Sequence, residues 1–180
     1  MTVEAPPTLV DLEGPERERA VPVVRDGFEG IYRWHAKRTL HEIALVRGAQ
    51  IDGAIVGVSM LERLVPEVGY VYYIAVLTAW RRHGIAARLL EDALQGFTAA
   101  GARVVYAAAE EDNRASIALF RSRGFRLVER NEPGFREGGL GAWGLRSRMR
   151  VVHGEVLMGL RLATEPPPSA GGPETAARRD

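Results

Sequence analysis

The stretch from Val76 to Leu90 constrains this chain more than any other part of its sequence. It reads VLTAWRRHGIAARLL, in which the end of an apolar strand is followed by the turn Arg81-Arg82-His83-Gly84-Ile85-Ala86 and then by a helix. The first turn of a helix leaves several backbone N–H groups without intrahelical partners, and these donors together with the helix dipole attract phosphate. Gly84 lets the backbone approach an anion closely because it has no Cβ. The stretch therefore predicts a cradle for a pyrophosphate.

The spacing within this turn separates it from two common phosphate-binding loops. A nucleotide P-loop requires GxxxxGK[ST], and a dinucleotide fold requires GxGxxG after its strand. Residues 76–90 contain neither pattern and carry Arg-x-x-Gly-x-Ala at 81–86 instead. An ordinary strand-to-helix turn is the alternative interpretation of these six residues taken alone.

A second motif follows about thirty residues later, at Asn113–Phe125, with the sequence NRASIALFRSRGF. Asn113 is a favourable N-cap residue, and Gly124 is placed to end the helix. Phe125 then supplies the hydrophobic contact that often follows such a glycine. The segment predicts a short amphipathic helix with a defined beginning and end.

The two motifs, in this order and with a strand between them, resemble the signatures of the GNAT superfamily of acetyl-CoA-dependent N-acetyltransferases. Their spacing resembles that of the ribosomal-protein alanine N-acetyltransferase branch. The resemblance covers about residues 8–162 and is most specific in 70–125. It implies an α/β (mixed α+β) fold: a central mixed sheet of about seven strands with helices on both faces, in a single domain at 8–162. It also implies transfer of an acetyl group from acetyl-CoA to a primary amine by direct attack.

The motif match implies which residues hold acetyl-CoA. Members of the superfamily splay two strands apart, and the pantetheine arm pairs with the freed backbone as an added strand would. The turn before the helix at 84–100 would surround the pyrophosphate, and Asn113 would contact the cofactor or simply cap its helix. The positions expected to contact acetyl-CoA are Ile74, Ala75, Val76, Arg81, Arg82, His83, Gly84, Ile85, Ala86, Ala87, Asn113 and Phe120.

Proton handling is where this chain departs from its relatives. Many of them carry Tyr, thought to protonate the departing thiolate, at the position of Phe120, which has no ionisable group. The same relatives place a Glu base at the position of Ala108. Glu110 lies two residues further along the same strand face and could act directly or through water, although a solvated strand end is the alternative. Tyr72 is the second catalytic candidate, as a proton relay or as a lining of the acceptor pocket, with core packing as the alternative.

Three functions fit these observations. The leading one is an acetyl-CoA-dependent N-acetyltransferase with an unidentified acceptor, either a small-molecule amine or a protein N-terminus or lysine. The substitutions at Phe120 and Ala108 also fit a CoA-binding sensor or assembly module with little catalysis, and a bulkier acyl-CoA donor would need the same phosphate turn. Trp34 either forms part of an acceptor wall or packs against the sheet. The glycine- and arginine-rich segment 135–150 is either an acceptor-side lid or a long loop with a short helix at 142–149.

Composition narrows the remaining possibilities. The 180 residues carry a formal net charge of +1 and no cysteine, which gives no case for nucleic acid as a partner and excludes disulfides, thiolate metal sites and a cysteine nucleophile. No histidine has metal-ligand spacing, so no metal is expected. The longest apolar run is too short for a membrane span and no leader is recognised, so we expect a cytoplasmic protein. Homodimer formation stays open. Residues 1–7 and 163–180 are expected to be disordered because of their proline-rich composition.

Periodicity predicts the order of the elements. Strands are expected at Thr8–Leu12, Ile43–Arg47 and Ile51–Leu64, with the last two joined by a turn at Gly48-Ala49-Gln50. Two short helices are expected between Pro15 and Leu40, with Pro22 and the glycines at 27 and 30 as breaks. Further elements are predicted in the order strand 69–76, helix 84–100, strand 103–109, the helix after Asn113, strand 125–129 and strand 155–162. Strand–helix–strand units in the middle imply parallel pairing there.

Overall fold

The computed structural model describes residues 6–128, 148–149, 151 and 154–163. The described strands form one seven-stranded sheet in the order β1-β2-β3-β4-β5-β7-β6. The strands are β1 Thr8–Asp11, β2 Leu45–Ile51, β3 Ala54–Val65, β4 Val68–Val76, β5 Val104–Glu110, β6 Arg126–Leu127 and β7 Glu155–Arg161. The helices are α1 Val21–Gly27, α2 Gly30–Glu42, α3 Ile85–Ala99 and α4 Arg114–Ser122, with short 3-10 helices at Gly14–Ala20 and Thr78–Trp80. The predicted disordered ends lie outside the described residues, apart from residues 6, 7 and 163.

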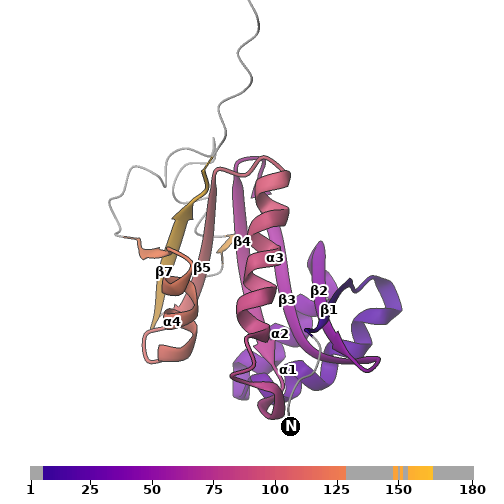
Figure 1. Cartoon of the computed structure of the whole chain (residues 1–180). Coiled ribbons are helices and arrows are strands. Elements are labelled where there is room, and N and C mark those ends of the chain that lie inside the picture. Colours follow the sequence, from indigo (N-terminus) through magenta and orange to yellow (C-terminus); the bar gives the residue numbers. More distant parts are fainter. Residues whose placement is uncertain (1–5, 129–147, 150, 152–153, 164–180) are drawn as a thin grey trace, which may run out of the picture.

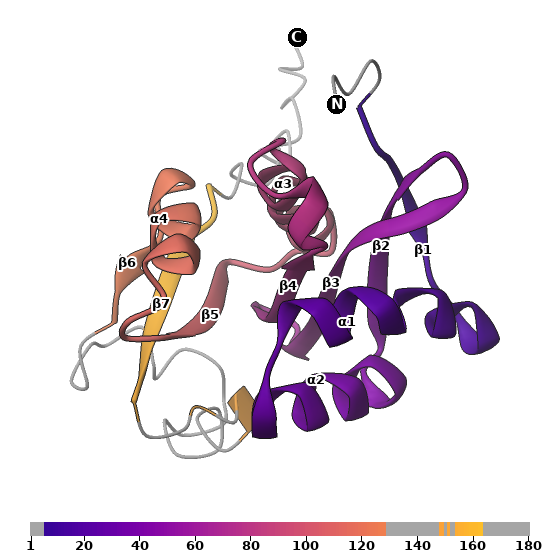
Figure 2. The ribbon, with the colours of Figure 1, turned by 90° about the horizontal axis from the view of Figure 1, so that it is seen from below.

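The helices cover both faces of the sheet. Figure 2 shows α1 and α2 on one face and α3 and α4 on the other. One stripe of α3 is buried against the sheet, because four side chains spaced four residues apart are all at most 4% exposed. These side chains are Ile85, Leu89, Ala93 and Phe97. The predicted mixed sheet with helices on both faces is therefore confirmed.

Pairing within the sheet is antiparallel except between β4 and β5. That ladder is parallel, as predicted, and runs only from Val68 opposite Val104 to Val71 opposite Ala107. Both strands continue beyond it, β4 as far as Val76 and β5 as far as Glu110. The remainder of β4 pairs with β3 alone, and the remainder of β5 pairs with β7 alone. The sheet is thus divided, over part of its length, between its two central strands (Figure 1).

The predicted hairpin turn at Gly48-Ala49-Gln50 is wrong. These residues lie inside β2, where Gly48 pairs with Val58, and the chain turns instead at Asp52 and Gly53. Both turn residues have positive φ, 48° and 80°, as a two-residue Asp-Gly hairpin requires. Gly48 is needed for space, since a Cβ there would lie 3.0 Å from side-chain atoms of Leu12 and Ile55.

The prediction of two helices between Pro15 and Leu40 is also incomplete. A 3-10 helix occupies Gly14–Ala20 and leads directly into α1, so this region holds three helical elements. Pro22 does not break a helix, because it lies in the first turn of α1, where its missing N–H is not needed. The predicted break at Gly27 and Gly30 is confirmed, and Gly30 has a φ of 51°.

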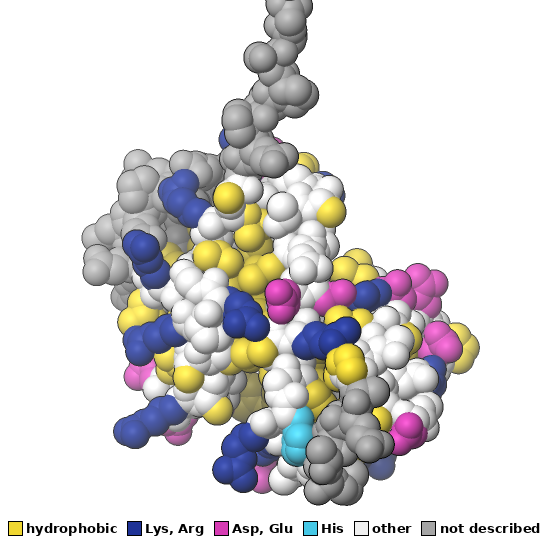
Figure 3. Space-filling model, in the orientation of Figure 1, with side chains coloured by type: hydrophobic (Ala, Val, Ile, Leu, Met, Phe, Trp, Pro, Cys, Tyr) yellow, Lys and Arg dark blue, Asp and Glu magenta, His cyan; other side chains and the backbone are white. Residues whose placement is uncertain are grey.

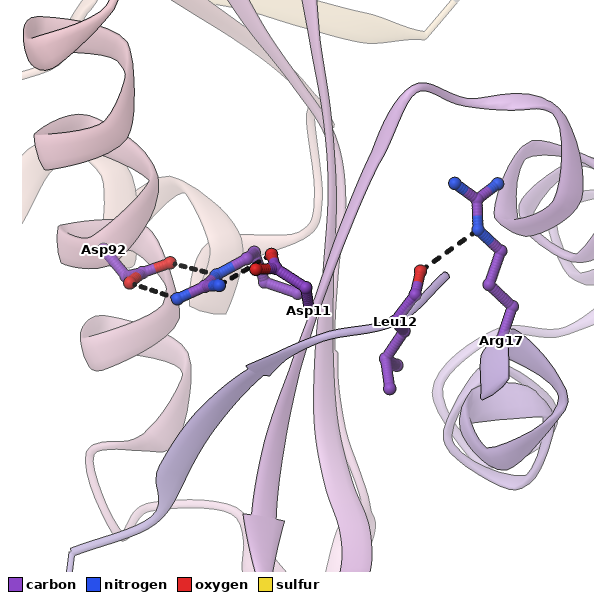
Figure 4. A network of polar contacts seen from close by, with 5 residues as sticks. Asp11, Leu12, Arg17 and Asp92 are labelled. Atoms are coloured by element: carbon purple, nitrogen blue, oxygen red, sulfur yellow. Dashed lines mark hydrogen bonds and ion pairs between the residues drawn. The ribbon is translucent and has the colours of Figure 1, made fainter. Parts of the chain in front are cut away.

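Two arginines join neighbouring elements of the fold (Figure 4). Arg47 of β2 donates to both carboxylate oxygens of Asp92 on α3, at 2.8 and 2.9 Å, and to Asp11 of β1 at 2.6 Å. Arg17 donates to the carbonyl of Leu12 and to three carbonyls at and just after the end of α2. Charged donors suit carbonyls at a helix C-terminus, where the partial charge is negative. The side chain of Arg17 therefore holds α2 in its place below the sheet.

Candidate active site

The division between β4 and β5 leaves one edge of β4 open. Beyond Val71 no residue of β4 pairs with β5, so the backbone groups on that side of residues 74–76 have no strand partner among the described residues. Two elements approach this edge on the α3 face: the start of α3, which follows β4 in sequence, and α4, which follows β5. Figure 3 shows hydrophobic side chains along the seam between α3 and α4, with basic side chains on both sides and a recess at its lower end.

A β-bulge in β4 lies where the two strands part. Met60 pairs with Tyr73 and Leu61 pairs with Val71, so Tyr72 is an extra residue in β4. As a result the consecutive residues Tyr72 and Tyr73 both pack on the α1 and α2 face, whereas Val71 and Ile74 pack on the α3 face. The bulge therefore directs two adjacent tyrosines toward one side of the opening.

The predicted phosphate turn lies at the N-terminus of α3 on the open edge. Arg82 and Gly84 have positive φ values of 63° and 75°, and Gly84 is the N-cap residue of α3. The first bond of the helix runs from the N–H of Arg88 to the carbonyl of Gly84 at 3.0 Å. Among the described residues, no acceptor is found for the backbone N–H groups of residues 82–87. A Cβ at Gly84 would meet nothing within 4 Å, so the mouth of the turn is open. Unpaired donors at an open helix N-terminus fit a diphosphate.

Asp26 at the end of α1 holds the entry to this turn. Its Oδ2 atom accepts from the backbone N–H of Thr78 at 2.5 Å and from the hydroxyl of the same residue at 2.9 Å. The backbone hydrogen bond from Thr78, followed by the hydroxyl bond, lowers the pKa of Asp26 below its ordinary value of 3.8. Arg81 donates to the carbonyl of Val76 at 3.3 Å, and the carbonyl of Arg81 lies 2.8 Å from Nδ1 of His83. The turn is therefore braced from α1 and from within.

The Asn113 motif folds as its residues predict. The side chain of Asn113 accepts from the N–H of Ser116 at 3.0 Å, which confirms the N-cap. Gly124 has a φ of 85°, and the N–H of Phe125 donates to the carbonyl of Phe120 at 3.2 Å, which closes the helix. Phe120 is 5% exposed and its ring lies 5.2 Å from that of Phe125. The side chain of Phe120 thus belongs to the core between α4 and the sheet, and its contact with acetyl-CoA stays a prediction.

All five tyrosines of the chain gather on the α1 and α2 face. Three come from β4, one from β5 and one, Tyr32, from the first turn of α2. The hydroxyl of Tyr32 lies 3.4 Å from Oε1 of Glu155, which pairs across the sheet with Glu110. The face opposite the phosphate turn therefore combines phenols with two carboxylates. The tyrosines are Tyr32, Tyr70, Tyr72, Tyr73 and Tyr106.

Burial and the two carboxylates raise the pKa values of two of these tyrosines. Burial is the largest cause for Tyr32, whose pKa rises to about 12, and the charges of Glu155 and Glu110 add to it. Burial, then the charge of Glu155, also raises the pKa of Tyr70, which is 2% exposed. Both phenols are therefore neutral near pH 7 and remain hydrogen-bond donors. The charge of Glu110 is thus close enough to Tyr32 to oppose ionisation of its phenol.

The two predicted catalytic residues differ in their surroundings. Glu110 is exposed at the end of β5, on the strand face predicted from Ala108. The hydroxyl of Tyr72 donates to the carbonyl of Arg148 at 2.6 Å, and its ring contacts that of Tyr70 at 4.6 Å. The guanidinium of Arg148 in turn bonds the carbonyl of Leu64. Tyr72 would have to leave its carbonyl partner to transfer a proton. Most of the segment 135–150 lies outside the described residues.

Two residues of this face, Tyr32 and Glu155, are not among the residues predicted from the sequence. They are 123 positions apart, so no local spacing connects them. Trp34 does not pack against the sheet, since it is 57% exposed. Among the residues that the structure describes, no group of three His, Cys, Asp or Glu side chains could hold a metal ion, and no helix is long and apolar enough to cross a membrane.

Comparisons with known proteins agree with this geometry. The model of the acetyltransferase (GNAT) family matches residues 9–125. N-alpha-acetyltransferase RimI of Mycobacterium tuberculosis is 32% identical over 154 residues, which cover 81% of this chain and 96% of that protein. The fold is similar to the ribosomal-protein-S18-alanine N-acetyltransferase of Escherichia coli, with a TM-score of 0.65 and 18% identity over 88% of this chain and 96% of that one. It is equally similar to a Bacillus subtilis acetyltransferase in complex with CoA, with a TM-score of 0.64 and 18% identity over 87% and 99% of the two chains. The chain belongs to the acetyltransferase (GNAT) family and is an acetyl-CoA-dependent N-acyltransferase.

Proposed function

We propose that acetyl-CoA lies in the opening between β4 and β5, with its diphosphate on the α3 face and its thioester reaching toward the α1 and α2 face. The N–H groups of residues 82–87 would hold the diphosphate, and the open edge of β4 at Ile74, Ala75 and Val76 would pair with the pantetheine arm. Arg81 and Asn113 would line the same seam. The observation that carries this proposal is that unpaired backbone donors and an unpaired strand edge adjoin one opening.

The amine would approach from the opposite face, where Glu110 and Glu155 lie beside Tyr32. Two carboxylates attract an ammonium group, and Glu110, directly or through water, would accept the proton that the amine loses before attack. The nitrogen then attacks the thioester carbon, the C–S bond breaks to release CoA as a thiolate, and the second proton of the nitrogen passes through water to that thiolate or to solvent. A thiol has a pKa near about 8.5, so the thiolate leaves readily without a strong acid, and water can protonate it.

We further propose that the acceptor is the α-amine of a polypeptide, as the name of the mycobacterial relative suggests. An α-amine has a pKa near about 8, so roughly a tenth of it is neutral at pH 7, whereas a lysine amine near about 10.4 is almost wholly charged. A chain that carries Ala108 and Phe120 where relatives carry an acid and a phenol is better suited to the more easily deprotonated amine.

Release of free thiol from acetyl-CoA tests this proposal. Peptides with a free N-terminus should release thiol well above the hydrolysis rate, and the same peptides with a blocked N-terminus and a free lysine should not. Calorimetric titration with CoA should show micromolar binding. Tight binding without thiol release from any amine would favour the alternative of a CoA-binding module, for which Phe120 is the motivating observation.

The location and assembly of the protein stay predictions. We expect the cytoplasm, where acetyl-CoA and newly made polypeptides are both present. Sedimentation of the purified chain will show whether it forms a homodimer.

A further inference from the structure

The outward side of α2 carries an unusual pair of exposed hydrophobic residues. Ile31 is 68% exposed and Trp34 is 57% exposed, and they are two of the four large hydrophobic side chains found exposed among the described residues. Residues three apart on a helix are neighbours on one stripe. The opposite stripe of α2, which includes Ala36 and Leu40, is buried against the sheet. Burial against the sheet therefore does not explain Ile31 and Trp34.

Positive charge surrounds this pair. α2 carries Arg33, Lys37 and Arg38, and its single acid, Glu42, is already paired with Arg38 at 2.7 Å. Arg38 also lies 5.7 Å above the ring of Trp34. Lys37 is the only lysine of the chain, it is exposed, and no described carboxylate lies within ion-pair distance of it. We call Ile31, Trp34, Lys37 and Arg38 the α2 stripe.

An exposed tryptophan among cationic side chains is the composition of a protein-binding surface. Tryptophan and arginine are enriched among the residues that dominate binding energy, whereas solvent-exposed surfaces that bind nothing favour polar side chains. The apolar side chains of the stripe can contact one apolar residue of a partner polypeptide, and its cations can pair with acidic residues next to that apolar residue. Its charge is opposite to that of the acceptor side, where Glu110 and Glu155 lie.

The stripe begins at the acceptor side itself. Tyr32, which reaches Glu155, is the residue next to Ile31. From residue 32 to residue 38 the helix rises about 9 Å, at 1.5 Å per residue. An extended peptide covers that length in roughly three residues, at about 3.3 Å each. A polypeptide with its N-terminus at the carboxylates would therefore bring its second and third residues past Trp34 and its fourth and later residues to Lys37 and Arg38.

We propose that the α2 stripe docks the acceptor polypeptide and selects one with an apolar residue followed by acidic residues shortly after its N-terminus. This proposal rests on the proposed function, because it assumes that the acceptor is the α-amine of a polypeptide. The carboxylates of the site hold the ammonium group, and the stripe holds the chain behind it. The stripe thus sets which polypeptides are modified, while the opening between β4 and β5 sets what is done to them.

The test uses three hexapeptides that share an N-terminal alanine and a leucine at position 3, with glutamate, serine or arginine at positions 4 to 6. Thiol release gives kcat/KM for each, with alanine amide as an acceptor too small to reach the stripe. We expect the glutamate peptide to exceed the arginine peptide about tenfold in kcat/KM, with the serine peptide between them. The preference should diminish at high salt, because screening weakens exposed charges.

Variants separate docking from a structural role. Lys37→Glu should reverse the order of the glutamate and arginine peptides, and Trp34→Ala should lower kcat/KM for all three peptides about tenfold. Both variants should leave kcat/KM for alanine amide unchanged. Arg121→Glu, the same kind of charge change on α4 across the sheet, is the matched control and should alter nothing.

The outcomes are distinct. Equal kcat/KM for the three peptides in the wild type would overturn the docking proposal while leaving the acetyltransferase in place. A sedimentation shift on Trp34→Ala would also overturn it, because the stripe would then be an interface between two copies of the chain. Absence of thiol release from every peptide and from alanine amide would instead refute the proposed function.

Discussion

On the α3 side of the sheet the candidate site is made mostly of backbone, whereas on the α1 and α2 side it is made of side chains. The proposed donor side consists of N–H groups at the start of α3 and the open edge of β4. The proposed acceptor side consists of five phenols and two carboxylates from α2, β4, β5 and β7. A backbone site survives most substitutions and is damaged by changes that alter the path of the chain. A side-chain site is sensitive to each residue separately, so the two sides should respond differently to mutation.

The largest expected effect is on the acceptor side. Glu110→Gln should lower kcat/KM about 100-fold, because a general base contributes at least that much, and it should leave the Kd for CoA unchanged. Thiol-release kinetics and calorimetry measure the two quantities. Glu111→Gln is the matched control, since it removes an exposed carboxylate one position away. Equal losses of kcat/KM in the two variants would show that Glu110 contributes only its negative charge and is not the general base.

The next effect should fall on the donor side. Gly84→Ala places a Cβ on a residue with a φ of 75°, which costs about 1–2 kcal/mol and moves the turn. We expect the Kd for CoA to rise about tenfold, as that energy implies. Gly96→Ala, on the exposed side of α3 and also with open space around its Cβ, should leave the Kd unchanged and stabilise the helix by about 1 kcal/mol. An unchanged Kd for Gly84→Ala would show that the turn does not bind the diphosphate of CoA.

The ion pair that holds α3 against β2 should affect the stability of the fold alone. Arg47→Met removes a two-pronged contact to Asp92, which is the main reason that the pKa of Arg47 is raised. The pair is largely shielded, so we expect a loss of about 1–2 kcal/mol in the free energy of unfolding, measured with urea. Arg38→Met breaks an exposed pair on α2 and should cost under about 0.5 kcal/mol. The reverse ranking would contradict this account of how α3 is held.

The smallest effect should come from Asp26, which braces the phosphate turn from α1. Asp26→Asn weakens two hydrogen bonds to Thr78, so we expect the Kd for CoA to rise about threefold. Because the folded pKa of Asp26 is lowered, its contribution to stability is full above pH 3.8 and is lost as the pH falls through the lower folded value.

The melting temperatures of the wild type and Asp26→Asn, followed by circular dichroism, should therefore converge as the pH falls below 3.8. Asp112→Asn, an exposed loop residue, provides the control and should match the wild type at every pH. A gap between wild type and Asp26→Asn that persists in acid would mean that the carboxylate charge is not what holds Thr78.

The contrast between a site made of backbone and a site made of side chains also explains which parts of the fold the sequence predicts. Gly84, Asn113 and Gly124 act within a few residues of themselves, as an αL N-cap, a side-chain cap and a helix terminator, so their roles can be deduced locally. The hairpin turn was misplaced because Gly48 was interpreted as a turn residue. Its lack of a side chain serves packing against Leu12 and Ile55 instead.

The acceptor side could not be assembled from local patterns. Tyr32 meets Glu155 only because β7 inserts between β5 and β6, which brings the first residue of β7 beside α2. The bulge at Tyr72 likewise depends on its register with β3 and not on any residue type within β4. Sequence spacing predicts Glu110 on the correct strand face, but its proximity to Tyr32 follows from the packing of α2.

Titration of the protein, labelled with nitrogen-15, with CoA tests the central claim most directly, because amide shifts report on backbone donors one residue at a time. We predict the largest changes at residues 82–87 and along the open edge of β4 at 74–76, with little change on the outward side of α2. Changes confined to other elements, with residues 82–87 unaffected at saturating CoA, would contradict the account.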